Sequence, residues 1–291
     1  MKIILLMPTK NEDWILNSTL PSALKLVDAA IVSDQRSTDR TLEILNSFKK
    51  VTVIENTEKF HSNKVRWSLL DKSREKFGTN NLILNLDADE YISNKLFFKN
   101  LNYIKNLPKG TSVSLPWVQL WKSNTKFRSD KGVWNPKTNK KTCVFLDDGK
   151  VSYSNELIIN DHTSRVPTEN ISNSVVIDKL PLIHAQFVNW DRSQAKQVLY
   201  QCRELINGIT VNEINDKYRN STTDKNVKLK KIKKKWLDGA EIPKNISECR
   251  VEDTWHYKEI KNIFAEHSIA KFKDLNIWEP HFMRKLLGDF N

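Results

Sequence analysis

The stretch Leu82-Ile83-Leu84-Asn85-Leu86-Asp87-Ala88-Asp89-Glu90 decides the fold. Its first five residues form a mostly apolar run, which is typical of a strand covered on both faces of a sheet. In an extended chain, residues i and i+2 point to the same side, so Asp87 and Asp89 can reach one cation. Few carboxylates together with several waters suit Mg²⁺ or Mn²⁺. The alternative is a solvated turn after the strand, with Glu90 opening a helix.

The chain before this stretch repeats the same order of strand, polar cluster and helix. We expect strands over 3–7, 29–33 and 51–54, and helices over 13–26, 41–48 and 65–77. This alternation predicts an α/β fold: a Rossmann-like, mostly parallel sheet with right-handed crossovers and helices on both faces. Ligands of such sheets bind beyond the carboxyl ends of the strands, where the polar clusters fall. Pro21 is expected to break or kink the first helix, and Ser37-Thr38-Asp39 to cap the second.

The pattern changes after residue 110. Strands are expected over 112–120, 142–146 and 175–183, a helix over 192–206, and a basic helix over 228–237. The rest of the chain has a helical, aromatic pattern. We therefore expect a helical C-terminal extension beyond the sheet.

Composition excludes several classes of protein. The 291 residues are 39% hydrophobic and 28% charged, which is typical of a globular chain with a large core. The longest opening apolar run has five residues, whereas a signal peptide needs about 7–15 and a membrane span about 20. The three cysteines are far apart and include no Cys-x-x-Cys, which argues against disulfides or a cysteine zinc site. We expect a cytoplasmic protein.

The net charge is +12, from 47 basic and 35 acidic residues. Such a surface attracts nucleic acid, anionic lipid or phosphorylated substrates, and charge alone does not choose among them. Seven lysines lie in Lys225–Lys235, with Leu229, Ile232 and Trp236 spaced for the opposite face of a helix. A basic amphipathic helix is typical of contact with an anionic membrane surface, and a solvated helix face is the alternative.

Three motifs, in this order and at this spacing, resemble the signatures of family 2 glycosyltransferases with the GT-A fold. They are Met7-Pro8-Thr9-Lys10-Asn11-Glu12, Val32-Ser33-Asp34-Gln35-Arg36-Ser37-Thr38-Asp39-Arg40-Thr41 and Leu86-Asp87-Ala88-Asp89-Glu90. The resemblance covers residues 1–95 and extends to about 205. It implies a nucleotide-sugar donor and inversion at the anomeric carbon.

The resemblance also implies roles for individual residues. Asp89 would hold the metal, and Asp87 would touch the ribose or a metal-bound water. The positions assigned to the nucleotide are Thr9, Asn11, Glu12, Asp34, Ser37, Lys64, Arg66 and Asp87. Four have structural alternatives: Asp34 as a helix cap, Glu12 as a first-turn glutamate favoured by the helix dipole, and both Lys64 and Arg66 as a solvated helix start.

An inverting transfer needs a base for the acceptor hydroxyl, and a carboxylate is expected. Family members often carry a His-Glu pair after the central hairpin. Here the region is Ser154-Asn155-Glu156-Leu157, so Glu156 is the candidate base, although Asn155 replaces the usual histidine. Asp147, Asp148 and Asp161 are rivals, and a surface carboxylate is the structural alternative.

Five further side chains are candidates for the donor and acceptor sites. His184 closes an apolar strand and is a possible third metal ligand, or else a hydrogen-bonded core histidine. Arg192 and Lys196, at i and i+4, could neutralise a diphosphate, or form a solvated helix face. Trp117 and Trp134 are candidate platforms for an acceptor sugar, although most tryptophans are core residues.

Together these features predict a metal-dependent inverting glycosyltransferase that uses Mn²⁺ or Mg²⁺. It would move a hexose or deoxyhexose from a nucleotide-sugar to a hydroxyl of a glycan or lipid-linked acceptor. The GT-A domain would span 1–205 and the basic helical extension 206–291, with peripheral contact at the inner face of the membrane through Lys225–Lys235 and no specific nucleic acid. Rivals are a nucleic-acid-binding protein, a transferase that only binds, and a nucleotidyltransferase, although Pro8-Thr9-Lys10-Asn11 lacks the glycines of a phosphate loop.

Overall fold

The computed structural model describes residues 1–291 except 59–61, 158–162, 223–224, 240–241, 243–249 and 289–291. Four parallel strands form the first half of its sheet, in the order β4-β1-β2-β3. They are β1 (Ile3–Thr9), β2 (Ala29–Asp34), β3 (Val51–Glu55) and β4 (Leu82–Asn85). The connecting helices are α1 (Asp13–Leu24), α2 (Thr41–Asn46) and α3 (Asn63–Phe77). The expected α/β class with a mostly parallel sheet is confirmed.

The run of apolar residues in β1 is explained by packing on both faces of the sheet. Leu5 and Met7 belong to one core with Leu16 of α1, whereas Ile4 and Leu6 belong to another with Leu69 of α3. Alternate residues of a strand point to opposite faces, so a strand between two helical layers is apolar at every position.

The second half of the sheet is mixed. β8 (Lys140–Leu146) runs antiparallel to β4, and β6 (Thr111–Trp121) runs antiparallel to β8. Beyond them lie β7 (Lys126–Arg128) and β11 (Leu229–Lys231), while β9 (Asn173–Val176) and β10 (Leu182–Phe187) both pair parallel with β6. The short β5 (Glu90–Ile92) pairs antiparallel with β10. The remaining elements of this half are α4 (Asn94–Lys105) and the 3₁₀ turns η1 (Gly132–Trp134) and η2 (Lys234–Trp236).

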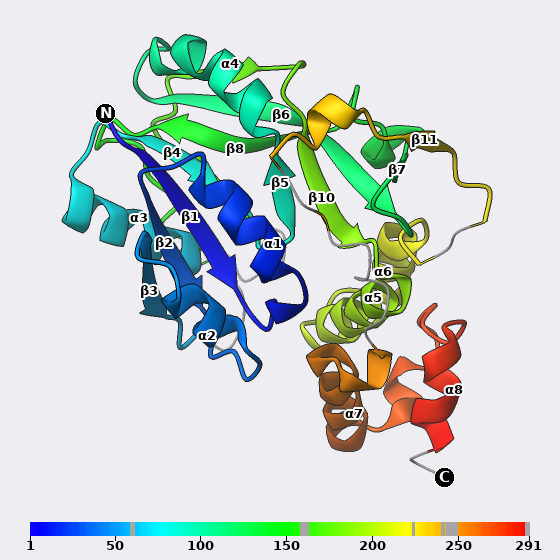
Figure 1. The fold of residues 1–291 in the computed structure, drawn as a ribbon. Helices are drawn as coiled ribbons and strands as arrows, with labels where there is room; N and C mark the ends of the chain where they lie inside the picture. Colours follow the sequence, from blue (N-terminus) through cyan, green and yellow to red (C-terminus); the bar gives the residue numbers. More distant parts are fainter. Residues whose placement is uncertain (59–61, 158–162, 223–224, 240–241, 243–249, 289–291) are drawn as a thin grey trace.

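The C-terminal helices have a core of their own. They are α5 (Trp190–Ile206), α6 (Val211–Tyr218), α7 (Trp255–His267) and α8 (His281–Gly288), with 3₁₀ turns η4 (Val251–Asp253) and η5 (Ile269–Phe272). Buried side chains such as Leu199 of α5, Ile260 and Phe264 of α7, and Met283 of α8 pack together. Figure 1 shows this group beyond the arrowheads of β1 and β10, at the carboxyl end of the parallel strands.

The basic helix predicted over 228–237 is wrong. Leu229–Lys231 instead forms the edge strand β11 against β7, and Lys234–Trp236 is a 3₁₀ turn. Crowded lysines repel one another along a helix face. In addition, Ile232, Trp236 and Leu237 pack against the core around Phe127, so tertiary contacts set the conformation. All seven lysines of Lys225–Lys235 are exposed.

Two other predictions need correction. The single strand expected over 175–183 is two strands, β9 and β10, separated by a turn that contains Pro181. Proline lacks the N–H that a central strand donates. As a result, His184 lies within β10 rather than at its end. Pro21 does not break α1, which continues to Leu24.

Among the described residues, no helix is both long and apolar enough to cross a membrane.

Candidate active site

A cavity of about 410 Å³ opens at the carboxyl ends of the parallel strands. Its walls come from the loop after β1, the end of β2, the turn after β4, and from β6, β8, β10, α5 and α7. Of the residues predicted for the site, those that line the cavity are Thr9, Glu12, Arg66, Asp87, Asp89, Trp117, His184 and Lys196. The topology therefore brings these eight residues together from six separate segments.

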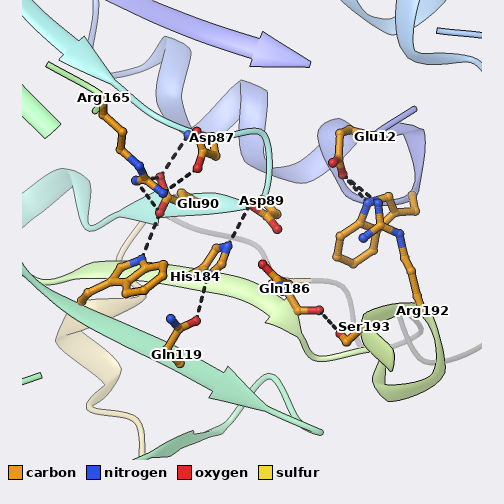
Figure 2. Close-up of polar contacts among 12 residues, drawn as sticks. Glu12, Asp87, Asp89, Glu90, Gln119, Arg165, His184, Gln186, Arg192 and Ser193 are labelled. Atoms are coloured by element: carbon orange, nitrogen blue, oxygen red, sulfur yellow. Dashed lines mark hydrogen bonds and ion pairs between the residues drawn. The ribbon is translucent and has the colours of Figure 1, made fainter. Parts of the chain in front are cut away.

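Strand pairing places Asp89 beside His184. The chain turns after β4, and Glu90 then starts β5, which pairs with β10 so that Glu90 lies opposite His184. The Ala185 N–H donates to the Asp89 carbonyl at 2.9 Å. Asp89 Oδ1 thereby lies 3.2 Å from His184 Nε2, and both side chains are almost fully buried (Figure 2).

The His184 ring is oriented by Gln119 of β6. Nδ1 of His184 lies 2.6 Å from Gln119 Oε1, which can only accept, so Nδ1 carries a proton and Nε2 faces Asp89. Burial opposes the charge on Asp89, but the nearby His184 and Lys196 outweigh it and hold the pKa of Asp89 below its usual range. Asp89 is therefore a carboxylate, and its Oδ2 is buried without a hydrogen-bond partner in the described part of the chain.

This arrangement fits a divalent cation. An imidazole whose second nitrogen donates to an oxygen, next to a carboxylate with one unpartnered oxygen, is the donor set that Mn²⁺ or Mg²⁺ accepts. No cluster of three or more His, Cys, Asp or Glu side chains suited to a metal occurs among the described residues. A cation held by Asp89 and His184 would thus take its remaining ligands from water and substrate.

Asp87 has different partners from Asp89. Its Oδ1 lies 3.2 Å from Arg66 Nη2 and its Oδ2 lies 2.5 Å from Arg165 Nη2. Burial opposes the charge on Asp87, but Arg165 and Arg66 outweigh it and keep the pKa of Asp87 low. Because both oxygens are engaged by guanidinium groups, Asp87 differs from Asp89 in having no oxygen left without a partner.

The fully buried Glu90 fixes Arg165. Arg165 Nη1 lies 2.7 and 2.6 Å from the two carboxylate oxygens of Glu90, which also accepts from Trp117 Nε1 at 3.1 Å and from the Asp87 N–H at 3.0 Å. Figure 2 shows Arg165 pointing to both acidic side chains. Trp117 stacks on His184 with ring centroids 5.0 Å apart.

Glu12 and Arg192 form a second buried pair. Arg192 Nη2 lies 3.0 Å from Glu12 Oε2, its guanidinium packs 4.1 Å from the Trp14 ring, and Trp14 Nε1 donates to the same oxygen. Burial raises the pKa of Glu12, against the opposing effect of Arg192 and Lys196. Glu12 lines the cavity and Arg192 lies behind it, so of the two predicted phosphate residues only Lys196 is in the wall.

Asn11, Asp34 and Ser37 lie behind the cavity in one hydrogen-bonded loop. Asp34 accepts from the Ser37 hydroxyl at 2.6 Å and from the Ser37 N–H at 2.9 Å, and from Thr9 Oγ1 at 3.2 Å. Asn11 adopts a left-handed conformation, and its Oδ1 accepts from the Thr38 N–H at 2.7 Å. These hydrogen bonds fix the chain at the ends of β1 and β2, where Thr9, Ser33 and Gln35 line the cavity.

Other predicted residues lie outside the cavity wall. Lys64 is exposed on α3, and Glu156 is exposed with its carbonyl accepting from Asn63 Nδ2 at 2.7 Å. Trp134 is buried against Trp121 and Phe187. Of the rival bases, Asp147 and Asp148 follow β8 at the amino ends of the parallel strands, away from the cavity, and Asp161 lies outside the described residues.

The sequence did not single out several residues of the wall. Arg165 belongs to no spacing pattern that would have marked it. Glu90, which ends the third motif, is fully buried outside the wall and holds Arg165. Arg203 was detectable, because Lys196, Tyr200 and Arg203 follow one another at helical spacing on one face of α5. The cavity has seven basic and three acidic side chains, so it suits an anionic ligand: Lys10, Arg66, Lys140, Lys141, Arg165, Lys196 and Arg203 against Glu12, Asp87 and Asp89.

The chain is similar to a known family and to solved structures. The family model for glycosyl transferase family 2 matches residues 4–155. The crystal structure of S. aureus TarS residues 1–349 is 14% identical, with a TM-score of 0.42, over 99% of this chain and 88% of that one. Glucosyl-3-phosphoglycerate synthase from Mycobacterium tuberculosis, crystallised with Mn²⁺, UDP and glucosyl-3-phosphoglycerate, is 20% identical, with a TM-score of 0.29, over 40% of this chain and 44% of that one. No curated protein matches the chain.

Proposed function

This chain belongs to glycosyl transferase family 2, as its three motifs predicted, and we propose that it is a metal-dependent inverting glycosyltransferase. Its donor would be a nucleotide-sugar, and its acceptor a hydroxyl of a glycan or of a lipid-linked glycan. The observation that carries the proposal is the pair Asp89 and His184 inside a basic cavity at the carboxyl ends of the parallel strands, with Asp89 Oδ2 unpartnered among the described residues.

The nucleoside would bind along the edge formed by β1 and β2. Thr9, Ser33, Gln35 and Asn56 line this part of the cavity and offer hydroxyl and amide groups to a base and a ribose. Glu12 is held by Arg192 and Trp14 at the same edge and can accept from ribose hydroxyls. Asn11, Asp34 and Ser37 would act by holding this loop in place.

The leaving diphosphate would bind next to Asp89. Asp89 and His184 would hold Mn²⁺ or Mg²⁺, which supplies electrostatic stabilisation of negative charge on the diphosphate. Lys196 lines the same cavity. Burial opposes the positive charge of Lys196, but its interactions with Tyr200, Asp89 and Glu12 outweigh the effect of burial and raise its pKa. A lysine that stays protonated in a partly buried site stabilises the departing phosphate.

The acceptor hydroxyl would approach from the side of Trp117 and the segment 163–165. Trp117 presents an aromatic ring to the cavity, and apolar sugar faces pack on such rings. We propose Glu156 as the base, because it lies seven residues before Thr163 in the segment that leads into this wall. Asp161, in the same segment, is the competing carboxylate.

Turnover of a donor panel tests the proposal. UDP-, GDP-, CDP- and dTDP-sugars would be incubated with Mn²⁺ and the protein, and release of the nucleoside diphosphate measured. Asp89→Asn should lower release by at least about 100-fold with the fold intact, because removing one preorganised electrostatic group costs that much. Asp216→Asn, at an exposed carboxylate on α6, is the control and should be fully active. Full activity of Asp89→Asn would reject the metal site.

The base is tested by two matched variants. Glu156→Gln should lose turnover and keep donor binding, while Asp161→Asn should keep both. If the two results are exchanged, Asp161 is the base. A fully active Glu156→Gln with an equally active Asp161→Asn would place the base outside this segment.

A further inference from the structure

The C-terminal helices and the loop after β1 bring a group of nitrogen donors to the cavity. Lys196 and Arg203 project from one face of α5, His256 comes from α7, and Lys10 from the loop after β1. All four line the cavity. The family match ends at residue 155, so three of these residues lie in the part of the chain that it does not reach.

Trp255 and His256 at the start of α7 have buried polar atoms that no described residue partners. His256 is 1% exposed, and its Nδ1 has no hydrogen-bond partner among the described residues. Nε1 of Trp255 is likewise buried and unpartnered in that part of the chain. Buried polar atoms are nearly always satisfied, by protein, water or ligand, since leaving them unpaired is costly. The pattern therefore indicates that something polar binds here.

The charges around His256 indicate the sign of that ligand. Lys10 Nζ lies 5.1 Å from the centre of the Trp255 ring, and Arg203 Cζ lies 5.6 Å from it. Burial lowers the pKa of His256, and Arg192, Lys196, Arg203 and Lys10 lower it further because all are positive. Arg203 has Glu259 at 3.3 Å, and Arg192 has Glu12. Positive charge still predominates, so an anion would be bound.

We propose that Lys10, Lys196, Arg203 and His256 form a phosphate-binding subsite. Phosphate oxygens would accept from the ammonium, guanidinium and imidazole groups, as anions do in charge-assisted hydrogen bonds. The natural source of the phosphate rests on the proposed function: it is either the diphosphate of the donor or a phosphate carried by the acceptor. Both sources would bind through the same hydrogen bonds. If the phosphate belongs to the donor, a bound nucleoside diphosphate fills the subsite; if it belongs to the acceptor, a bound nucleoside diphosphate leaves the subsite open.

Calorimetric titration with inorganic pyrophosphate in EDTA tests the subsite without any metal or sugar. Arg203→Gln and His256→Gln should each weaken pyrophosphate binding by about tenfold or more, which is what losing one hydrogen bond to a charged group costs. Lys258→Gln removes one positive charge from the exposed side of α7 and should leave the affinity unchanged. Equal affinities in wild type and both subsite variants would overturn the proposal.

Two further variants decide the test if Arg203→Gln fails to fold. Glu259→Gln removes the ion-pair partner of Arg203 and keeps its charge, so it should bind pyrophosphate at least as tightly as wild type. Lys196→Gln should weaken binding as Arg203→Gln does. If Arg203→Gln unfolds, as judged by circular dichroism, these two variants decide, and affinities unchanged in Lys196→Gln would contradict the subsite.

A competition experiment distinguishes the two sources. Pyrophosphate is titrated in EDTA into protein saturated with whichever of UDP, GDP, CDP or dTDP binds most tightly. Loss of pyrophosphate binding assigns the subsite to the donor diphosphate, and retained binding assigns it to a phosphate on the acceptor. Asp89→Asn should still bind pyrophosphate in EDTA, so failure of the metal site and failure of this subsite give different results.

Discussion

Asp87 and Asp89 lie one residue apart but have different partners. Asp87 is held by Arg66 and Arg165 through both oxygens. Asp89 lies beside His184, and its second oxygen has no partner in the part of the chain that the structure describes. The spacing of the two carboxylates was readable from the sequence. Their different surroundings were not, because Arg165 and Glu90 act through contacts between residues 75 positions apart.

Glu90 is expected to stabilise the cluster that it forms with Arg165, Asp87 and Trp117. Glu90→Gln keeps the shape of the side chain but removes the charge that faces Arg165 at 2.6 Å. Because the buried Arg165 then keeps only Asp87 as a charged partner, the free energy of unfolding should fall by about 3 kcal/mol. Urea denaturation measures this change in the free energy of unfolding.

The matched control for Glu90→Gln is Glu43→Gln. Glu43 pairs with Arg40 on the exposed surface, so this variant should unfold at the same urea concentration as wild type. A Glu90→Gln variant that is also as stable as wild type would show that the Arg165 cluster contributes nothing to the fold.

Among the elements, the parallel strands were the most predictable and the lysine-rich segment the least. The apolar run and polar end of β4 identify it as a strand with a ligand beyond it. The pairing of β5 with β10, which places Asp89 beside His184, joins residues 94 positions apart and leaves no local pattern. In Lys225–Lys235, helical spacing of Ile232 and Trp236 predicted a helix, but packing around Phe127 and pairing with β7 produced a strand and a turn.

The seven lysines of this segment are all exposed, so the segment still carries a dense positive charge. We expect them to bind anionic membrane surfaces, since each lysine close to such a surface contributes about 1 kcal/mol. Replacing Lys230, Lys233 and Lys234 by Gln should therefore reduce sedimentation with vesicles that contain phosphatidylserine. Wild-type binding should weaken as salt is raised.

The control for the vesicle experiment is a triple variant in the N-terminal half. Replacing Lys49, Lys95 and Lys99 by Gln removes the same charge elsewhere and should leave vesicle binding unchanged. If both triple variants lose binding equally, net charge rather than this segment is responsible.

At the scale of the whole molecule, two cores meet at one cavity. The sheet and its helices supply the nucleoside edge and the carboxylates, and the C-terminal helices supply Lys196, Arg203 and His256. The sequence predicted the α/β class and a helical C-terminal extension. It did not predict that α7 lines the same cavity as Asp89, because no motif connects residue 256 with the strand ends.

The account depends most on the cation held by Asp89 and His184. Calorimetric titration of the full chain with UDP, GDP, CDP and dTDP, in Mn²⁺ and in EDTA, measures this directly. We predict that at least one nucleoside diphosphate binds about tenfold or more tightly with Mn²⁺, and that Asp89→Asn abolishes the gain. Affinities that are equal in Mn²⁺ and EDTA, or a gain that survives in Asp89→Asn, would contradict the account.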